Sequence, residues 1–192
     1  KAETVVHGAN VWGMGGREYQ PEEYLYGRDP RIMTQLDLNR DRAETHPRLC
    51  HDGTVVVIQC VGSRNDERPY CSKICCANTI KKALMIREKS PQAHIIVLYR
   101  DIRTYGLKED LYTQARNQGV IFIRYDEADP PDLAVEPSGI SSGPGRLVIQ
   151  VHEKILNRPL LLEPDIVILA AAVLPNERSE ERRVGKECRS RW

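Results

Sequence analysis

Three apolar, β-branched segments of strand length constrain the fold more than any other feature of the sequence. They cover residues 54–59 (TVVVIQ), 94–99 (HIIVLY) and 120–125 (VIFIRY), and residues 165–170 (DIVILA) have the same character. A half-exposed strand alternates apolar with polar residues, whereas continuous runs are typical of strands buried on both faces of a parallel sheet. The sequence therefore predicts a mostly parallel central sheet.

Segments of helical character separate these strands. Residues 70–89 carry apolar side chains at helical spacing and are followed by a Ser-Pro pair that stops a helix. Residues 107–117 predict a second helix, ended by Gly119, and residues 33–42 predict a short helix within the polar crossover 17–48. The buried stripe expected on the first helix comprises Ile74, Ile80, Ala83, Leu84 and Ile86. Strand, helix and strand of these lengths form a right-handed βαβ unit, so the predicted fold class is α/β and Rossmann-like.

The other segments are more polar. Residues 1–16 (KAETVVHGANVWGMGG) predict a strand that closes on a glycine-rich turn. Residues 129–145 are rich in Pro, Gly, Ser and Asp, which is typical of a surface loop. Residues 146–152 and 159–163 predict an antiparallel pair of strands joined around Asn157.

The composition is that of one ordinary soluble domain or of part of a larger one. Of 192 residues, 41% are hydrophobic and 29% are charged, which suffices to fill a core. No apolar run approaches the roughly 18 residues of a membrane span. The net charge of +1 gives no reason to expect nucleic acid or a membrane surface as a partner. The expected location is cytoplasmic.

Both ends of the sequence are interpreted as the ends of an internal fragment. The chain starts at Lys1 without a charged and then apolar signal segment. Residues 178–192 (RSEERRVGKECRSRW) contain six basic and three acidic residues and resemble the translation of a sequencing adapter. They are interpreted as an artefact, and a basic peptide that binds nucleic acid is the alternative.

Four cysteines, Cys60, Cys71, Cys75 and Cys76, follow the pattern C-x10-C-x3-C-C. Cys60 comes at the carboxyl end of a predicted buried strand, and the other three are expected to open the next helix. Ligands of open α/β sheets gather at this edge, and the N–H groups of a helix N-terminus favour thiolates. Cys50 has no partner at a useful spacing and is interpreted as a lone thiol near the surface.

Three interpretations of these cysteines follow from their spacing. Four thiolates suit a 4Fe–4S cluster or zinc, and buried or redox-active thiols are the third possibility. Zinc sites usually use paired C-x2-C motifs, which are absent, and disulfides are disfavoured in a cytosolic enzyme. The spacing favours the cluster. Of the glycines in a G-x-G-x-x-G phosphate loop only Gly62 is present, so the standard mode of NAD(P) binding is not expected.

The loop after residues 94–99 contains Arg100, Asp101, Arg103 and Tyr105. These side chains either gate a cluster or offset its charge, or they tie the loop together through Asp–Arg pairs, which are common and individually weak. Both interpretations stay open at this stage.

Several segments together resemble the A-subunit family of heterodisulfide reductases, which includes the flavin subunits of quinone-interacting oxidoreductases. The segments are IQCVGSRNDERPYCSKICCANTIKKA, YRDIRTYG, GVIFIRY, GREYQPEEYLYG and DIVILAAAVLPNE, which extend over most of residues 1–177. The resemblance implies a thioredoxin-reductase-like FAD/NAD(P)-binding fold that carries FAD and an added 4Fe–4S cluster. It further implies that the four cysteines are the ligands of that cluster.

The same resemblance implies which residues lie near FAD: Gly15, Gly16, Leu174, Pro175 and Asn176. The first two end GANVWGMGG, which departs from the usual family pattern at Gly13 and Met14, and the other three end LAAAVLPN, in which alanine replaces a usual glycine. The main FAD fingerprint is not in this sequence. No catalytic residue is assigned, and the isolated fragment is expected to be inactive.

The expected function is electron transfer between FAD and the cluster, alongside other subunits of a heterodisulfide-reductase-type or quinone-interacting complex. A cluster-free flavoenzyme of the pyridine-nucleotide-disulfide type and a zinc-stabilised, non-catalytic α/β interaction module are the alternatives. The expected domains along the chain are 1–50, the end of an FAD domain and a linker; 51–164, a Rossmann-like domain; 165–177, the return to the FAD domain; and 178–192, the tail.

Overall fold

The computed structural model of the chain describes residues 15–40, 52–137 and 145–176. The chain divides into two units. One unit comprises Tyr19–Ala172, and the other combines the segment that ends at Glu18 with the segment that begins at Val173. The predictions for the strand before Gly15, for Cys50 and for the tail 178–192 concern residues outside this description, and the expected domain boundaries stay predictions.

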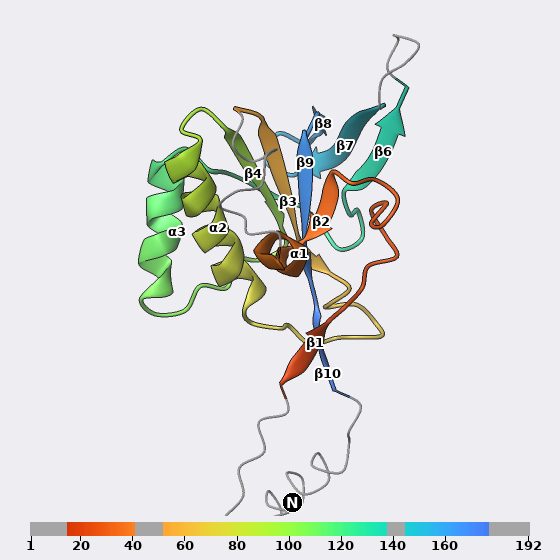
Figure 1. Ribbon diagram of the computed structural model, residues 1–192, viewed down its shortest axis with the longest axis vertical. Coiled ribbons are helices and arrows are strands. Elements are labelled where there is room, and N and C mark those ends of the chain that lie inside the picture. Colours follow the sequence, from red (N-terminus) through yellow and green to blue (C-terminus); the bar gives the residue numbers. More distant parts are fainter. Residues whose placement is uncertain (1–14, 41–51, 138–144, 177–192) are drawn as a thin grey trace, which may run out of the picture. The chain divides into compact units, whose positions relative to one another are not determined.

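A five-stranded parallel sheet forms the centre of the larger unit (Figure 1). Its strands, in spatial order, are β2 (Ile32–Thr34), β9 (Ile166–Ala171), β3 (Thr54–Val61), β4 (His94–Tyr99) and β5 (Ile121–Arg124). Every neighbouring pair is parallel. The four predicted apolar runs are thus confirmed as strands, and the α/β fold class with a parallel sheet is confirmed with them.

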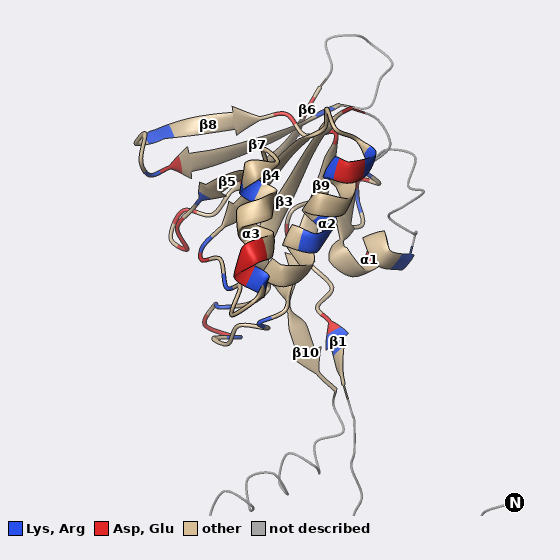
Figure 2. Ribbon diagram, turned by 90° about the vertical axis from the view of Figure 1, so that its left-hand side faces the viewer, with Lys and Arg blue, Asp and Glu red and all other residues tan. Residues whose placement is uncertain are grey.

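Helices cover one face of this sheet, and Figure 2 shows α3 beside α2 over the strands. The helices are α1 (Gln35–Arg40), α2 (Cys75–Lys89) and α3 (Lys108–Asn117). In α2, Ile80, Ala83 and Ile86 are buried against the sheet as predicted, because residues three apart share a helix face. Gly119 follows α3 with a φ of +81°, which confirms the predicted helix end.

Strand β2 and helix α2 depart from the sequence prediction. Residues 32–34, expected to lie in a linker and a helix, form strand β2, whose side chains are all buried. Helix α2 begins at Cys75 rather than at Tyr70, since the left-handed backbone of Lys73 (φ +62°) interrupts a helix there. Ile74 therefore stands before the helix and is 48% exposed, which corrects its assignment to the buried stripe.

A three-stranded antiparallel sheet packs on the other face through a second apolar cluster. It consists of β6 (Asp132–Glu136), β7 (Arg146–Glu153) and β8 (Arg158–Leu162). The predicted hairpin is confirmed, and Asn157 turns it with a φ of +48°. The prediction of a surface loop over 129–145 is wrong in part, because β6 lies within it, pairs with β7 and buries Leu133. No helix in the described ranges is both long and apolar enough to cross a lipid bilayer.

Candidate functional site

The carboxyl end of β3 is irregular. Cys60 has a φ of +64°, and the register of β3 against β9 shifts between Ile58 and Val61. Cys60 is part of the strand, one residue beyond the apolar run that predicted it. Gly62 follows with a φ of +67°, and a Cβ atom built on it would lie 2.1 Å from Cδ1 of Tyr19. Only glycine fits the chain at this point.

A short turn follows and is closed by its own backbone. The N–H of Arg64 donates to the carbonyl oxygen of Arg68 at 2.6 Å, and the N–H of Arg68 donates to Oδ1 of Asn65 at 2.8 Å. The guanidinium of Arg68 lies 4.4 Å from the centre of the Tyr19 ring, which sits against Gly62. This cation–π contact fixes the turn next to Cys60.

The other three cysteines approach the same edge from the loop and from α2. The N–H of Lys73 donates to Sγ of Cys71 at 3.3 Å, within an irregular segment, so Cys71 does not share a helix face with Cys75 as expected. The thiol of Cys75 lies 3.6 Å from the carbonyl oxygen of Ala171, at the end of β9. The thiol of Cys76 lies 3.7 Å from the carbonyl oxygen of Asp101, beyond β4.

The four thiols influence one another. Burial and then the other three thiols raise the pKa of Cys75 to about 12. Burial also raises the pKa of Cys60 and of Cys76, and Cys71 adds to both shifts. Buried thiols that repel one another as anions stay protonated unless a cation compensates their charge. The four cysteines are free, and their charges interact with one another, whereas their role as ligands stays a prediction.

The sulfur atoms do not close around a single ion. Among the described residues, no group of three or more His, Cys, Asp or Glu side chains lies close enough to hold one metal ion. A tetrahedral zinc site requires all four sulfurs within about 2.3 Å of one point. Four cysteine thiolates are the donor set that a 4Fe–4S cluster takes.

Arginine side chains surround the site. Arg64 and Arg100 lower the pKa of Cys60 against the larger effect of burial, and a backbone hydrogen bond from Arg103 does the same at Cys76. Asp101 pairs with Arg64 at 2.7 Å and with Arg103 at 3.3 Å. Ion pairs therefore tie this loop together, and the offset of a cluster's charge by its arginines stays a prediction.

One donor in this region has no acceptor. Nη1 of Arg64 is buried and makes no hydrogen bond within the described part of the chain. Buried N–H groups are nearly always paired, so an unpaired one indicates a missing acceptor. The Arg64 side chain also hydrogen-bonds the thiol of Cys60, so the orphaned donor fits an anionic group held beside that cysteine.

Sequence reasoning missed a buried polar network behind the cysteines. Nε2 of Gln35 and Nε2 of Gln59 donate to Oγ1 of Thr79 at 2.5 and 2.6 Å. Gln35 also reaches the carbonyl oxygen of Cys75 at 3.4 Å. The network links β3, α1 and the first turns of α2, and thus fixes Cys75 relative to the strand that carries Cys60. No spacing in the sequence signals it, because the three residues belong to three separate elements.

The residues expected near FAD lie in the smaller unit. Strand β1 (Gly16–Glu18) pairs antiparallel with β10 (Val173–Pro175), which places Gly16 opposite Pro175. A Cβ atom on Gly16 would lie 2.7 Å from Cγ1 of Val173, so this pairing requires glycine. Gly15 has a φ of +61°, and no atom of the described residues lies within 4 Å of such a Cβ, so on that side its backbone is open to a ligand.

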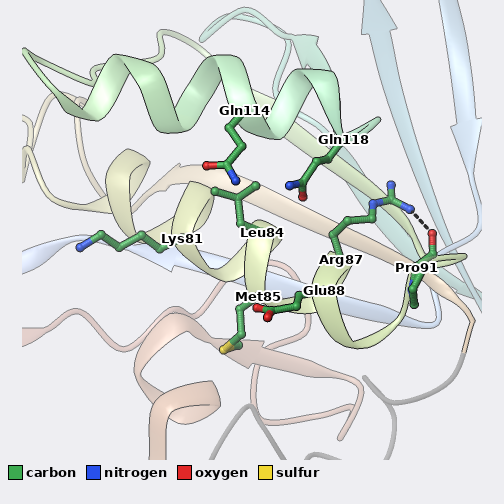
Figure 3. Close-up of a pocket in the computed structure, with 8 residues that line it drawn as sticks. All are labelled: Lys81, Leu84, Met85, Arg87, Glu88, Pro91, Gln114 and Gln118. Atoms are coloured by element: carbon green, nitrogen blue, oxygen red, sulfur yellow. Dashed lines mark hydrogen bonds between the residues drawn. The ribbon is translucent and has the colours of Figure 1, made fainter.

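Of two cavities in the larger unit, one is lined by a cysteine and the other is not. One, of about 240 Å³, is lined by Cys60, Tyr24, Tyr125 and Arg100 among others, at the carboxyl edge of the sheet. A larger groove of about 770 Å³ lies between α2 and α3 (Figure 3). Its lining includes Leu84, and Arg87 donates to the carbonyl oxygen of Pro91 at 2.8 Å along it. The groove has no cysteine in its lining and is separate from the candidate site.

The fold is α/β, and four free cysteines lie near the carboxyl edge of its parallel sheet. No family model matches the sequence. The chain is 34% identical over 167 residues to the iron-sulfur A-subunit of CoB–CoM heterodisulfide reductase from Methanocaldococcus jannaschii, a match that covers 80% of this chain and 24% of the relative. It is 30% identical over 198 residues to the A-subunit of the H(2):CoB-CoM heterodisulfide,ferredoxin reductase from Methanothermobacter thermautotrophicus, covering 92% and 28%.

The chain belongs to the A-subunit family of heterodisulfide reductases, and it spans about a quarter of the length of these relatives. Among solved structures, similarity is found to L-lysine 6-monooxygenase from Pseudomonas syringae, with 10% identity over 80% of this chain and 43% of that one and a TM-score of 0.47. An amine oxidase from Pseudomonas geniculata gives 16% identity, 91% and 22% coverage and a TM-score of 0.46.

Proposed function

We propose that the chain is the electron-transferring segment of an oxidoreductase subunit of the heterodisulfide reductase type. In it, Cys60, Cys71, Cys75 and Cys76 hold a 4Fe–4S cluster. The observation that carries the proposal is the convergence of four free, mutually interacting thiols on one edge of the sheet. The name of the M. jannaschii relative, an iron-sulfur subunit, supports it.

The cluster and FAD supply the one-electron and two-electron chemistry when they are bound. The residues of the chain bind and orient these groups and adjust their reduction potentials. The network around Thr79 fixes the start of α2, and the arginines beside Asp101 compensate the negative charge of four thiolates. The open backbone of Gly15, together with Leu174, Pro175 and Asn176, is proposed to contact FAD, which the remainder of a longer parent chain also binds. We further propose that the parent chain works as one subunit of a multi-subunit complex, as the names of its relatives state for those proteins.

The test is anaerobic purification of the full chain with iron and sulfide reconstitution, followed by an absorption spectrum and by iron and zinc analysis. A brown protein with about four irons per chain is expected. Cys75→Ser should remove most of the iron, whereas the matched control Cys50→Ser, outside the four-cysteine pattern, should retain it. A colourless chain with one zinc would favour the structural module, and a chain with neither metal would refute the site.

The flavin part of the proposal needs its own measurement. Free FAD is titrated into the chain, and the quenching of its fluorescence is followed. Binding that weakens in Gly15→Val supports the proposed contact, since a side chain would fill the open backbone. Binding that is unchanged by this substitution would remove Gly15 from the flavin site.

A further inference from the structure

Arg64 combines three features that its place in a loop does not explain. Its side chain is only 19% exposed, it hydrogen-bonds the thiol of Cys60, and its Nη1 is buried without an acceptor in the described residues. An arginine that served only to close the loop would satisfy all its donors within the loop. The unpaired donor therefore points to an acceptor that occupies the space beside Cys60.

The position of Arg64 is fixed from several sides. Its backbone is left-handed, with a φ of +59°, and its N–H donates to Arg68. Its carbonyl oxygen accepts from Nη1 of Arg100 at 2.9 Å. Its Nη2 is held by Oδ2 of Asp101 at 2.7 Å. A guanidinium held this way presents its remaining N–H groups in one direction with little loss of side-chain entropy on binding.

We propose that Arg64 donates a hydrogen bond through Nη1 to a sulfur atom of the centre held by the four cysteines, and that Asp101 is the positioning residue that holds it there. This inference rests on the proposed function, because the acceptor is a sulfur of the bound cluster. It adds a residue outside the ligand set that sets the reduction potential. Hydrogen bonds and positive charge near a cluster favour its more negative, reduced form, so Arg64 raises the potential.

The test compares reduction potentials of the reconstituted full chain by redox titration followed by electron paramagnetic resonance. Arg64→Gln is expected to lower the potential by about 59 mV or more, which is a tenfold change in the one-electron equilibrium. The matched control is Arg124→Gln, because Arg124 also faces Asp101, at 3.9 Å, but is 58% exposed, so that solvent screens its charge. The potential of this control should remain close to that of the wild type.

A second variant keeps the test decisive if Arg64→Gln loses the cluster. Arg64→Lys keeps the charge but has no second nitrogen with which to bind Asp101 and the cluster together, so its potential should lie between those of the wild type and Arg64→Gln. The iron content of each sample shows whether a variant has lost the cluster or has kept it with a changed reduction potential. If Arg64→Gln holds no iron, a lowered potential in Arg64→Lys still supports the proposal.

Equal potentials in the wild type and both Arg64 variants, with iron bound, would overturn the role of Arg64 and leave the proposed function standing. An equal shift in Arg124→Gln would also overturn it, since the effect would then be general surface charge. A wild-type chain that binds no iron would overturn the proposed function and this inference together.

Discussion

The buried hydroxyl of Thr79 offers the sharpest test of how the cysteine site is supported. Thr79 is 1% exposed, and its Oγ1 accepts from Gln35 and from Gln59, which are 7% and 1% exposed. Thr79→Val keeps the shape of the side chain but removes the acceptor. Two buried amide groups then lose a partner, and neither can reach water.

The expected loss follows from these contacts. A buried donor left unsatisfied costs about 1–3 kcal/mol. Gln35 keeps a second acceptor, the carbonyl oxygen of Cys75 at 3.4 Å, so its cost falls at the low end of this range. The combined decrease in the free energy of unfolding is therefore expected to be about 2–4 kcal/mol.

Urea unfolding of the metal-free chain measures this decrease. Thr79→Ser is the matched control, because it keeps the hydroxyl and loses one methyl group, at a cost of about 0.5–1.5 kcal/mol. A Thr79→Val chain as stable as the wild type, or a Thr79→Ser chain destabilised as much as Thr79→Val, would refute the argument that the hydroxyl carries the network.

Three further predictions concern the surroundings of the site. Gly62→Ala should lower the free energy of unfolding by about 1 kcal/mol or more beyond Gly106→Ala, since both glycines are left-handed but only Gly62 meets Tyr19; equal losses in thermal unfolding would contradict this. Burial raises the pKa of Tyr24 from 10.0 to about 12, so ionisation favours the unfolded chain and stability falls as pH rises through this window. Tyr24→Phe should make that fall shallower above about pH 10 in urea unfolding, and identical slopes would show that Tyr24 is solvated. In the metal-free chain, Cys75 should react with iodoacetamide at pH 8 roughly a hundredfold more slowly than free cysteine, measured by mass spectrometry of the modified peptide, because burial and the neighbouring thiols raise its pKa to about 12; a rate like that of free cysteine would place Cys75 in solvent.

Much of the central sheet was predictable from the sequence alone. Strand β4 has the predicted bounds, and β3, β5 and β9 differ from prediction by one or two residues at their ends. Strands buried on both faces need continuous apolar side chains, and this requirement is local and visible in the sequence. The four strands that were missed lack such runs. β1, β2 and β10 have three residues each, and β6 buries only Leu133.

The sequence by itself determined the α/β class, the long strands of the central sheet with the two helices between them, and the spacing of the four cysteines, because apolar periodicity and residue spacing are properties of neighbouring residues. Tertiary structure decided the rest. Cys71 lies outside the helix, Thr79 receives Gln35 from 44 residues away, and Asp101 holds Arg64 beside Cys60. These contacts join segments that are distant in the chain, so their partners become defined only when the sheet brings its carboxyl ends together.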